Sequence, residues 1–279
     1  MPKVTVSNLY IYPIKSTMGI SLSQASIDEL GLAFDRRFVI SDNSGQFISA
    51  RTEPTLCLVT TILTEYGIAL SAPTMPTLTL VYESFSEQYK SVNVWDDEVA
   101  GQLCSTEANS WFSDYLQRPC QLLYFGKESS RVKKGATDNP RKVAFADGYP
   151  LLLISQASLH ELNQRLLANN QKTVSMANFR PNIVVDNCLP FAEDGWQYIR
   201  IGEIEFKVSK SCERCILITV NPENGIKDAE QQPLSTLKTY RQTSSGEVLF
   251  GQNLIPLTSV RINQGDKHTV SKSQRCWDG

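Results

Sequence analysis

Two cysteines lie three positions apart in the segment SKSCERCILITV, residues 209–220. Cys212 and Cys215 could hold zinc, form a reversible disulfide, stay two unreactive thiols, or leave one thiolate to bind a metal carried by an organic cofactor. Structural zinc usually takes four nitrogen or sulfur ligands, and the chain has one such pair. A thioredoxin-like pair begins a helix, whereas the apolar run after Cys215 predicts a strand. The residues alone leave these alternatives open.

A cofactor that carries a metal would need side chains that hold its phosphate. Lysine and arginine supply charge-assisted hydrogen bonds to phosphate oxygens. Candidates occur in three short segments, YPIKS, FDRRF and FRPNIVV, as Lys15, Ser16, Arg36, Arg37, Arg180 and Asn182. Because neighbouring side chains of a strand point to opposite faces, we expect at most one of the adjacent arginines Arg36 and Arg37 to face such a site.

Composition limits the partners and the compartment. The 279 residues include 27 basic and 29 acidic side chains, and the net charge of −2 gives no field that would draw the chain onto nucleic acid or an anionic membrane. Seven scattered cysteines do not resemble a secreted disulfide framework. The N-terminus lacks the apolar stretch of a secretory signal, and YPLLLI is too short to cross a bilayer. We therefore expect a cytoplasmic protein without a membrane anchor.

The first half of the chain is predicted to be mostly β. Short β-branched and aromatic runs alternate with turn signals up to about residue 94, and DNSG at 42–45 is typical of a hairpin turn. Next, Trp111, Phe112, Tyr115 and Leu116 fall on one side of a helix that Pro119 ends. We assign residues 1–125 to an N-terminal β-rich domain that closes with this junction helix.

The second half, residues 126–279, is predicted to form another β-rich domain with a few helices. YPLLLIS indicates a buried strand, and Leu159, Leu162 and Leu166 form a helical stripe after it. Either Ser155 or Ser158 is expected to cap this helix, and Ser158 has capping-box spacing to Glu161. Further strands are expected in NIVVD, YIRIGEIEFKV, CILITV, EVLF and VRIN.

A basic stretch, SSRVKKGATDNPRK, lies between the two halves and is predicted to be a surface loop. Its charges, Arg131, Lys133, Lys134, Arg141 and Lys142, could steer an acidic electron-transfer partner. The simpler interpretation is that they only solvate the loop, which is what charge runs usually do.

Taken together, these segments resemble the MOSC family. LYIYPIKS, FDRRF, ARTEP, FADGYP, NFRPNIVV, CERCILITV and LFGQN follow one another in family order, so the resemblance covers residues 3 to about 265. It is closest to the branch of amidoxime-reducing components and bacterial reductases of N-hydroxylated bases. The resemblance implies a mainly β fold with some α, made of an N-terminal β-barrel-like domain and a C-terminal MOSC β-barrel domain.

The resemblance also implies a site for a molybdenum–molybdopterin cofactor. Cys215 would ligate the metal, with Cys212 as a neighbour, and Asp147 would lie beside it, both acting in catalysis. Lys15, Ser16 and Arg36 would hold the phosphate end, and Arg180 and Asn182 would bind the cofactor as well. Pyridoxal phosphate binding is a further label at the level of the family.

The implied activity is the reduction of N-hydroxylated or N-oxide compounds. The chain shows no dinucleotide fingerprint and no four-cysteine cluster, and Cys276 alone would not hold one, so we expect a separate electron donor such as a ferredoxin, flavodoxin or reductase. Some bacterial relatives carry a ferredoxin-like domain after MOSC. The alternative is a non-catalytic or sulfur-carrying protein that binds the cofactor and passes it on.

Overall fold

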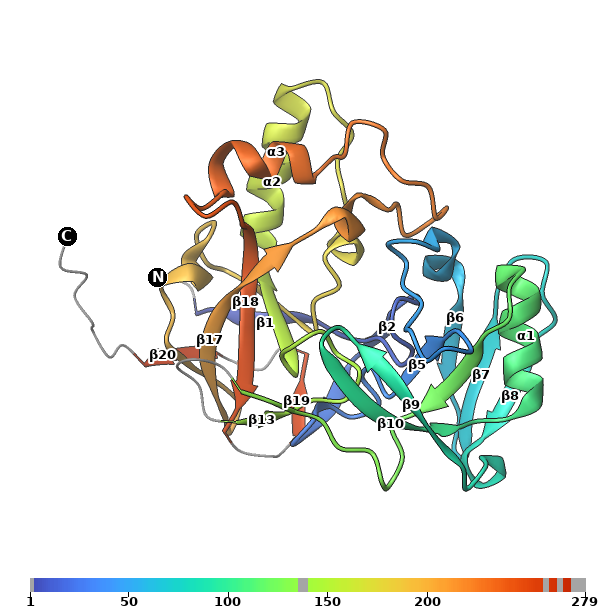
Figure 1. The fold of residues 1–279 in the computed structure, drawn as a ribbon. Coiled ribbons are helices and arrows are strands. Elements are labelled where there is room, and N and C mark those ends of the chain that lie inside the picture. Colours follow the sequence, from blue (N-terminus) through green and yellow to red (C-terminus); the bar gives the residue numbers. More distant parts are fainter. Residues whose placement is uncertain (1–2, 135–139, 258–260, 265–267, 272–279) are drawn as a thin grey trace.

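The chain forms two β-rich halves that lie side by side, and the computed structural model describes residues 3–134, 140–257, 261–264 and 268–271 (Figure 1). In these residues strands outweigh the three α-helices, so the mainly β prediction is confirmed. The described strands do not close a barrel, because each hydrogen-bonded order runs from one edge strand to another. The barrel expectation therefore holds for the fold class but not for a closed cylinder.

The largest sheet joins both ends of the chain. Its order is β2-β1-β15-β14-β18-β17-β16-β20, in which β14 and β15 are parallel and the other neighbours antiparallel. Its strands are β1 Thr5–Ile11, β2 Ile20–Leu22, β14 Leu151–Ser155, β15 Ile183–Asp186, β16 Tyr198–Ile201, β17 Ile204–Arg214, β18 Val248–Pro256 and β20 His268–Ser271. The first strand thus pairs with β15 of the second half, and the assignment of residues 1–125 as one folding unit stays a prediction.

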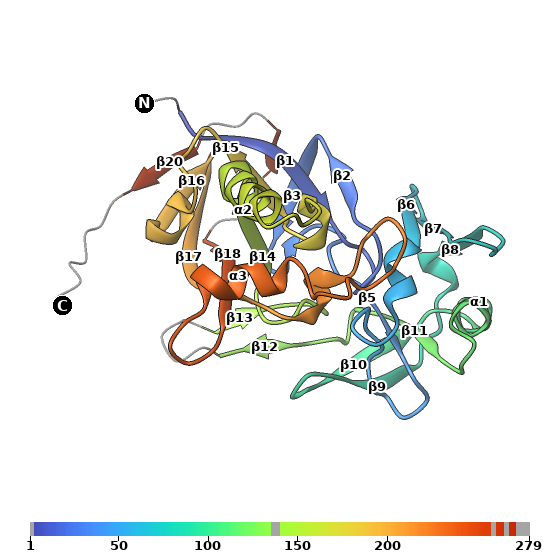
Figure 2. The ribbon, with the colours of Figure 1, turned by 90° about the horizontal axis from the view of Figure 1, so that it is seen from above.

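Both faces of this sheet are buried, as the continuous apolar run in β14 predicted. Leu151 and Leu153 pack in one apolar cluster, and Leu152 and Ile154 pack in another, in keeping with the two-residue period of a strand. The short strands β3 Gln24–Asp28, β4 Gly31–Leu32 and β19 Arg261–Asn263 cover the first face. The helices α2 Gln156–Ala168 and α3 Leu234–Arg241 cover the second face, as the view from above shows (Figure 2).

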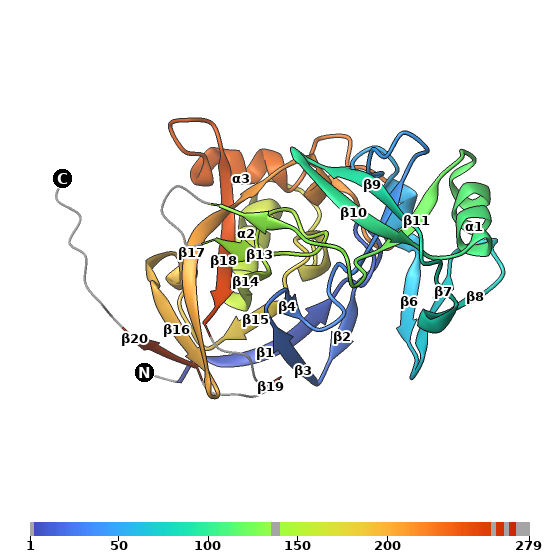
Figure 3. The same ribbon diagram turned by 60° about the horizontal axis from the view of Figure 1, so that its bottom comes forward.

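The N-terminal half adds two smaller sheets on the other side of the molecule (Figure 3). One has the order β5-β11-β10-β9, and its strands are β5 Phe38–Ser41, β9 Tyr89–Val94, β10 Asp97–Leu103 and β11 Gln121–Tyr124. The other is the meander β6 Thr60–Leu63, β7 Gly67–Ser71 and β8 Leu78–Val81. A two-stranded pair, β12 Val132–Lys133 with β13 Arg141–Lys142, follows. The 3-10 helices are η1 Pro54–Leu58, η2 Tyr82–Ser84, η3 Met176–Asn178, η4 Ala192–Gly195 and η5 Ile216–Thr219.

The junction helix and the hairpin turn are confirmed. Helix α1 spans Thr106–Leu116, and Ser105 caps it by accepting a hydrogen bond of 3.1 Å from the backbone N–H of Ala108. The helix ends at Gln117, which adopts the left-handed conformation before Pro119. In DNSG, Gly45 has φ 85°, and the carboxylate of Asp42 accepts from the backbone of the turn.

For α2, one of the two expected caps is right and the capping box is wrong. The Ser155 hydroxyl accepts from the backbone N–H of Ser158 at 3.0 Å, so Ser155 is the N-cap. Ser158 lies in the first turn, where its hydroxyl donates to Glu193 at 2.7 Å. The Ser158 hydroxyl, which the sequence pattern assigned to helix capping, is thus hydrogen-bonded to the buried carboxylate of Glu193 outside the helix. Glu161 instead pairs with Arg165 one turn later.

Candidate functional site

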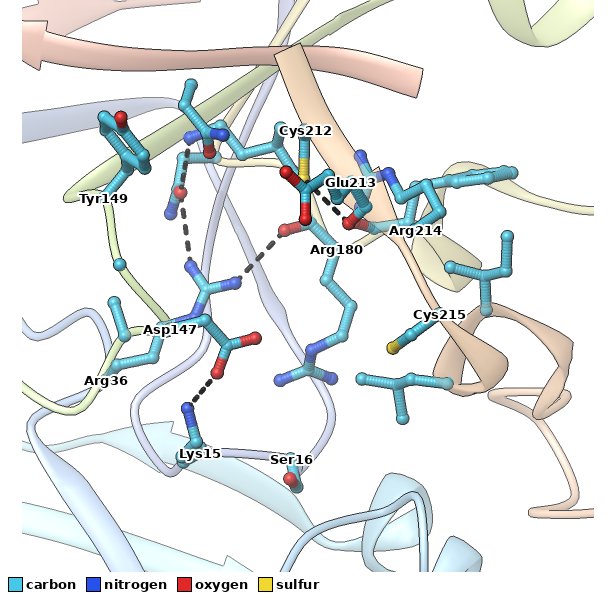
Figure 4. Close-up of a pocket in the computed structure, with 18 of the residues that line it drawn as sticks. Lys15, Ser16, Arg36, Asp147, Tyr149, Arg180, Cys212, Glu213, Arg214 and Cys215 are labelled. Carbon is cyan, nitrogen blue, oxygen red and sulfur yellow. Dashed lines mark hydrogen bonds and ion pairs between the residues drawn. The ribbon is translucent and has the colours of Figure 1, made fainter. Parts of the chain in front are cut away.

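One pocket collects all seven site residues that the sequence predicted. The space that it outlines, including its open mouth, is about 900 Å³. It lies where the two halves meet, and Figure 4 shows side chains from both halves around one space. The predicted residues in its wall are Lys15, Ser16, Arg36, Asp147, Arg180, Asn182 and Cys215.

The topology explains why residues far apart in sequence meet here. Strand β1 is antiparallel to β15, and β15 is parallel to β14. The C-terminal end of β1 and the N-terminal ends of β14 and β15 therefore lie next to one another, on the same side of the sheet along the strand direction. Lys15 follows β1, Asp147 precedes β14, and Arg180 precedes β15, so all three side chains reach the same pocket.

The cysteine segment differs from the prediction in its local structure. Strand β17 continues to Arg214, so Cys212 belongs to the strand, and the residues after Cys215 form η5 instead of the expected strand. The apolar run did not distinguish a strand from a helical turn, because Ile216 and Ile218 pack into the same cluster as α2 and α3. Two register shifts occur in β17, at Val208/Lys210 and Ser211/Glu213, and such bulges change the direction in which the last side chains of the strand point. Cys212 and Cys215 are free thiols that both line the pocket.

Arg36 and Arg37 point to different places, as expected. Arg36 lines the pocket. In contrast, Nη2 of Arg37 donates to both carboxylate oxygens of Asp28, at 2.8 and 2.9 Å. The guanidinium of Arg36 is held by the buried carboxylate of Asp35 at 2.7 and 2.8 Å, and it donates to Asn182 at 3.2 Å. Much of its charge is therefore neutralised inside the protein.

Asn182 ties three strands together beneath the pocket. Its Oδ1 accepts from the backbone N–H of Leu152 at 3.1 Å, in addition to Arg36, and its Nδ2 donates to the carbonyl of Tyr10 at 3.2 Å. The residue is almost fully buried. These bonds connect β14 and the start of β15 to β1. The amide therefore fixes the relative positions of the three strands that carry the neighbouring side chains of the pocket.

Two arginines in the wall each present a buried nitrogen without a protein partner in the described part of the chain. Nη1 of Arg180 donates to the carbonyl of Thr17 at 2.6 Å, and Nη1 of Arg214 donates to that of Phe179 at 3.0 Å. Nη2 of each has no partner among those residues. Burial, followed by repulsion from Arg36, lowers the pKa of Arg180. An unpaired buried donor is costly, so each of these nitrogens lacks an acceptor that the described residues do not supply.

Lys15 and Asp147 form an ion pair at the pocket wall. Nζ of Lys15 donates to the carbonyl of Phe145 at 2.8 Å and contacts a carboxylate oxygen of Asp147. Burial lowers the pKa of Lys15 from 10.5 to about 8, although the attraction of Asp147 opposes it. For Asp147, burial acts to raise the pKa, but Lys15 and then Arg51 outweigh it and hold that pKa well below its usual range. The Asp147 side chain is 58% exposed, so water screens part of this attraction.

Arg51 is a site residue that the sequence reasoning did not select. Its Nε donates to Sγ of Cys215 at 3.2 Å, and its Nη2 lies 3.7 Å from a carboxylate oxygen of Asp147. Trp95 completes the group, because its indole N–H donates to Asp147 at 3.0 Å and its ring lies 4.2 Å from the Arg51 guanidinium carbon. The segment ARTEP was a visible signal for Arg51, whereas no pattern pointed to Trp95.

Two charges of the predicted docking patch are not available to a partner. Arg131 is 4% exposed and donates to the carbonyl of Ala144 and to the carboxylate of Asp97. Arg141 is 9% exposed and stacks on the Tyr149 ring at 3.8 Å. The docking interpretation is therefore wrong for these two arginines, because carbonyl, carboxylate and aromatic groups of the protein hold them. Residues 135–139 of the stretch lie outside the described residues, as does Cys276.

Comparison with known proteins identifies both halves. Residues 3–119 match the MOSC N-terminal beta barrel domain, and residues 140–269 match the MOSC domain. Mitochondrial amidoxime-reducing component 1 of Mus musculus is 36% identical over 259 residues, which cover 89% of this chain and 75% of the relative. Component 2 of Homo sapiens is 36% identical over 253 residues, covering 87% and 74%. Component 2 of Rattus norvegicus is 39% identical over 249 residues, covering 85% and 72%.

Membrane-spanning helices are absent from the described residues. Each helix in that part of the chain is too short or too polar to cross a bilayer.

Proposed function

The chain belongs to the MOSC family, together with the mitochondrial amidoxime-reducing components, and on that premise we propose that it reduces N-hydroxylated compounds with a molybdenum–molybdopterin cofactor. The relatives are named for the reduction of amidoximes, which carry an N–OH group. The observation that carries the proposal is the position of Cys215, whose thiol lines a pocket that also holds Lys15, Arg51, Arg180 and Arg214.

The residues of the pocket fit this cofactor in two respects. A thiolate is a soft donor that suits a metal already held by sulfur, and Cys215 is positioned to supply it. The phosphate of the cofactor needs charge-assisted donors, and Arg180 and Arg214 each offer a buried nitrogen that has no partner in the described residues. Lys15, Ser16 and Arg36 lie in the same wall and would complete the cradle.

When bound, the cofactor supplies a centre that exchanges two electrons. The overall reaction consumes an N-hydroxylated compound, two electrons and two protons, and it yields the reduced nitrogen compound and water. Asp147, which is ionised at neutral pH, would accept a hydrogen bond from the substrate hydroxyl. In the cofactor-free protein the pKa of Lys15 is about 8, so Nζ is mainly protonated at neutral pH and would pair with both Asp147 and the cofactor phosphate.

The electrons must come from a second protein under this proposal. A ferredoxin, a flavodoxin or a reductase would serve, and the two electrons would enter from outside the pocket. The proposed location is the cytoplasm, and this proposal rests on the sequence alone. The relatives, in contrast, are named as mitochondrial. No nucleic acid partner is part of the proposal.

The test measures metal and turnover in the same preparations. The protein is produced in a host that makes molybdopterin, and molybdenum per chain is determined for the natural protein, Cys215→Ala and Cys212→Ala. Benzamidoxime reduction is followed with reduced methyl viologen as the artificial electron donor. We expect near-stoichiometric metal and turnover in the natural protein, loss of both in Cys215→Ala, and retention of metal in Cys212→Ala.

Two results would contradict the proposal in different ways. Bound molybdenum without turnover would favour the alternative, a protein that carries the cofactor or its sulfur and passes it on. Full metal content and full activity in Cys215→Ala would remove Cys215 from the metal site.

A further inference from the structure

We propose that Trp95 determines substrate specificity, as an aromatic side chain next to the pocket-wall residues Arg51 and Asp147 that favours planar aromatic N-hydroxylated compounds over aliphatic ones. The inference deepens the proposed function and rests on it. It is carried by the backbone at Trp95, the contacts of its ring and the rigidity of the hairpin that presents it.

The backbone at Trp95 is unusual for so large a side chain. Trp95 occupies the first position of the two-residue loop between β9 and β10, in which Val94 pairs with Asp97. Its φ is 59°, a conformation that such loops normally give to glycine or asparagine. A tryptophan held there against this preference is a backbone outlier of the kind that clusters at functional sites.

The ring is placed by contacts with the site itself. The indole N–H donates to Asp147 at 3.0 Å, and the guanidinium carbon of Arg51 lies 4.2 Å from the ring. Arg51 in turn donates to Sγ of Cys215. Phe47 meets the indole edge to face, with centroids 5.0 Å apart. The indole is thus two contacts away from the proposed metal ligand, yet the residue remains 44% exposed.

The hairpin that carries Trp95 is fastened to the segment that carries Asp147. Arg131 lies between them, and its Nε donates to Asp97 at 2.7 Å. Its Nη1 and Nη2 donate to the carbonyls of Ala144 at 3.0 Å and Asp147 at 3.2 Å. Because one buried guanidinium joins both segments, the indole and the carboxylate keep a fixed relation before any substrate binds, which is what pre-organised recognition requires.

The exposed part of the ring suits one chemical class of substrate. The Arg51 guanidinium lies over one face of the indole, so a planar aromatic group would pack against the exposed remainder of the ring, whereas a short aliphatic group offers neither the π face nor the area. Loss of one such stacking contact changes binding by about tenfold. The N–OH group would face Asp147 in either class, so the side group decides the preference.

The experiment compares two amidoximes that carry the same reacting group, benzamidoxime and acetamidoxime. Molybdenum-loaded natural protein, Trp95→Asn and Trp95→Phe are assayed with reduced methyl viologen. Asparagine tolerates a positive φ better than most residues, so Trp95→Asn removes the ring with little added backbone strain. We expect it to lower kcat/KM for benzamidoxime about tenfold, mainly through KM, and to change acetamidoxime by less than about twofold. Trp95→Phe should keep the preference, because it keeps a ring.

A second measurement does not depend on turnover. Trp95 is one of four tryptophans, so stacking of benzamidoxime on it should quench part of the protein fluorescence, and Trp95→Phe should lose that part. Tyr66→Asn is the control and should alter neither readout, because it changes an aromatic residue that is 62% exposed and whose hydroxyl donates to Glu65 instead of a residue of the pocket wall.

Equal losses for both amidoximes in Trp95→Asn, or benzamidoxime binding that does not involve Trp95 fluorescence, would overturn the inference. A fully loaded natural protein that reduces neither amidoxime would instead count against the proposed function. In that event the fluorescence titration still decides whether Trp95 binds the aromatic group.

Discussion

Nε of Arg51 donates a hydrogen bond of 3.2 Å to Sγ of Cys215, although the two residues are 164 positions apart in the chain. Arg51 belongs to the N-terminal half and Cys215 to the MOSC half, so neither half alone assembles this contact. The same guanidinium lies 3.7 Å from Asp147. Arg51 therefore links the proposed metal ligand to the carboxylate that would face the substrate.

The first prediction concerns the two nitrogens of the Arg51 guanidinium, Nε beside Cys215 and Nη2 beside Asp147. A lysine keeps the charge but has one nitrogen, so Arg51→Lys cannot contact Cys215 and Asp147 in the same geometry. We expect kcat/KM for benzamidoxime to fall at least about tenfold. The variant should be assayed together with its molybdenum content, which separates a slower enzyme from an empty one.

Arg118→Lys is the matched control for that change. Arg118 also contacts two carboxylates, those of Asp42 and Glu53, but it is 41% exposed and outside the pocket wall. This variant should keep the natural kcat/KM. Similar losses in both variants would assign the effect of Arg51 to stability instead of the site.

The second prediction concerns the arginine nitrogens that are proposed to bind the cofactor phosphate. Arg180→Met removes one of the two pocket-wall donors that are buried and have no partner in the described residues, so cofactor retention should fall at least about tenfold after gel filtration. Molybdenum per chain is the readout, with thermal unfolding as a check on folding. Arg165→Met is the control, because Arg165 is 45% exposed on α2. Stoichiometric molybdenum in Arg180→Met would rule out this nitrogen as a phosphate holder.

The third prediction follows from the pKa of Lys15 in the cofactor-free protein. Burial lowers that pKa from 10.5 to about 8. Between pH 8 and about 10, the unfolded chain therefore binds more protons at this residue than the folded protein does. The free energy of unfolding should rise with pH in this window, by up to about 1.4 kcal/mol per pH unit from this group.

Urea unfolding of natural protein and Lys15→Met, at several pH values in that window, measures this contribution. The variant should lose the rise, because methionine does not titrate. Saturating cofactor should also reduce the rise, since an anion beside Nζ raises the pKa of Lys15 again. The same slope in both proteins would show that Lys15 titrates normally in the folded state.

The fourth prediction concerns Gly251 in β18, which lies behind Arg214. Its φ is +82°, and an added Cβ would lie 2.6 Å from Cγ1 of Ile154 and 2.8 Å from the carbonyl oxygen of Leu153. Gly251→Ala should lower the free energy of unfolding by about 2 kcal/mol or more, measured by urea denaturation. Gly195→Ala, where an added Cβ would meet no atom within 4 Å, should change it by less than about 0.5 kcal/mol. Equal stabilities of the two variants would contradict the packing at Gly251.

Local patterns were enough to predict the elements whose structure is decided by their own residues. The stripe of Trp111, Phe112 and Leu116 predicted α1, because one helix face packs into one cluster. The run in β14 predicted a strand buried on both faces. The run after Cys215 was misread, because apolar residues alone do not fix the backbone when both a strand and a 3-10 turn would bury them.

The sequence by itself determined the family, the mainly β fold and seven candidate residues, since these depend on residue types and their order. Only the tertiary structure decided which nitrogens of Arg180 and Arg214 remain unpaired and that Arg51 meets Cys215. It also decided that Trp95 meets Asp147. Each of these relations joins side chains from separate strands or loops. Their distances are set by sheet register, bulges and buried guanidinium contacts, and no local pattern in the chain encodes those.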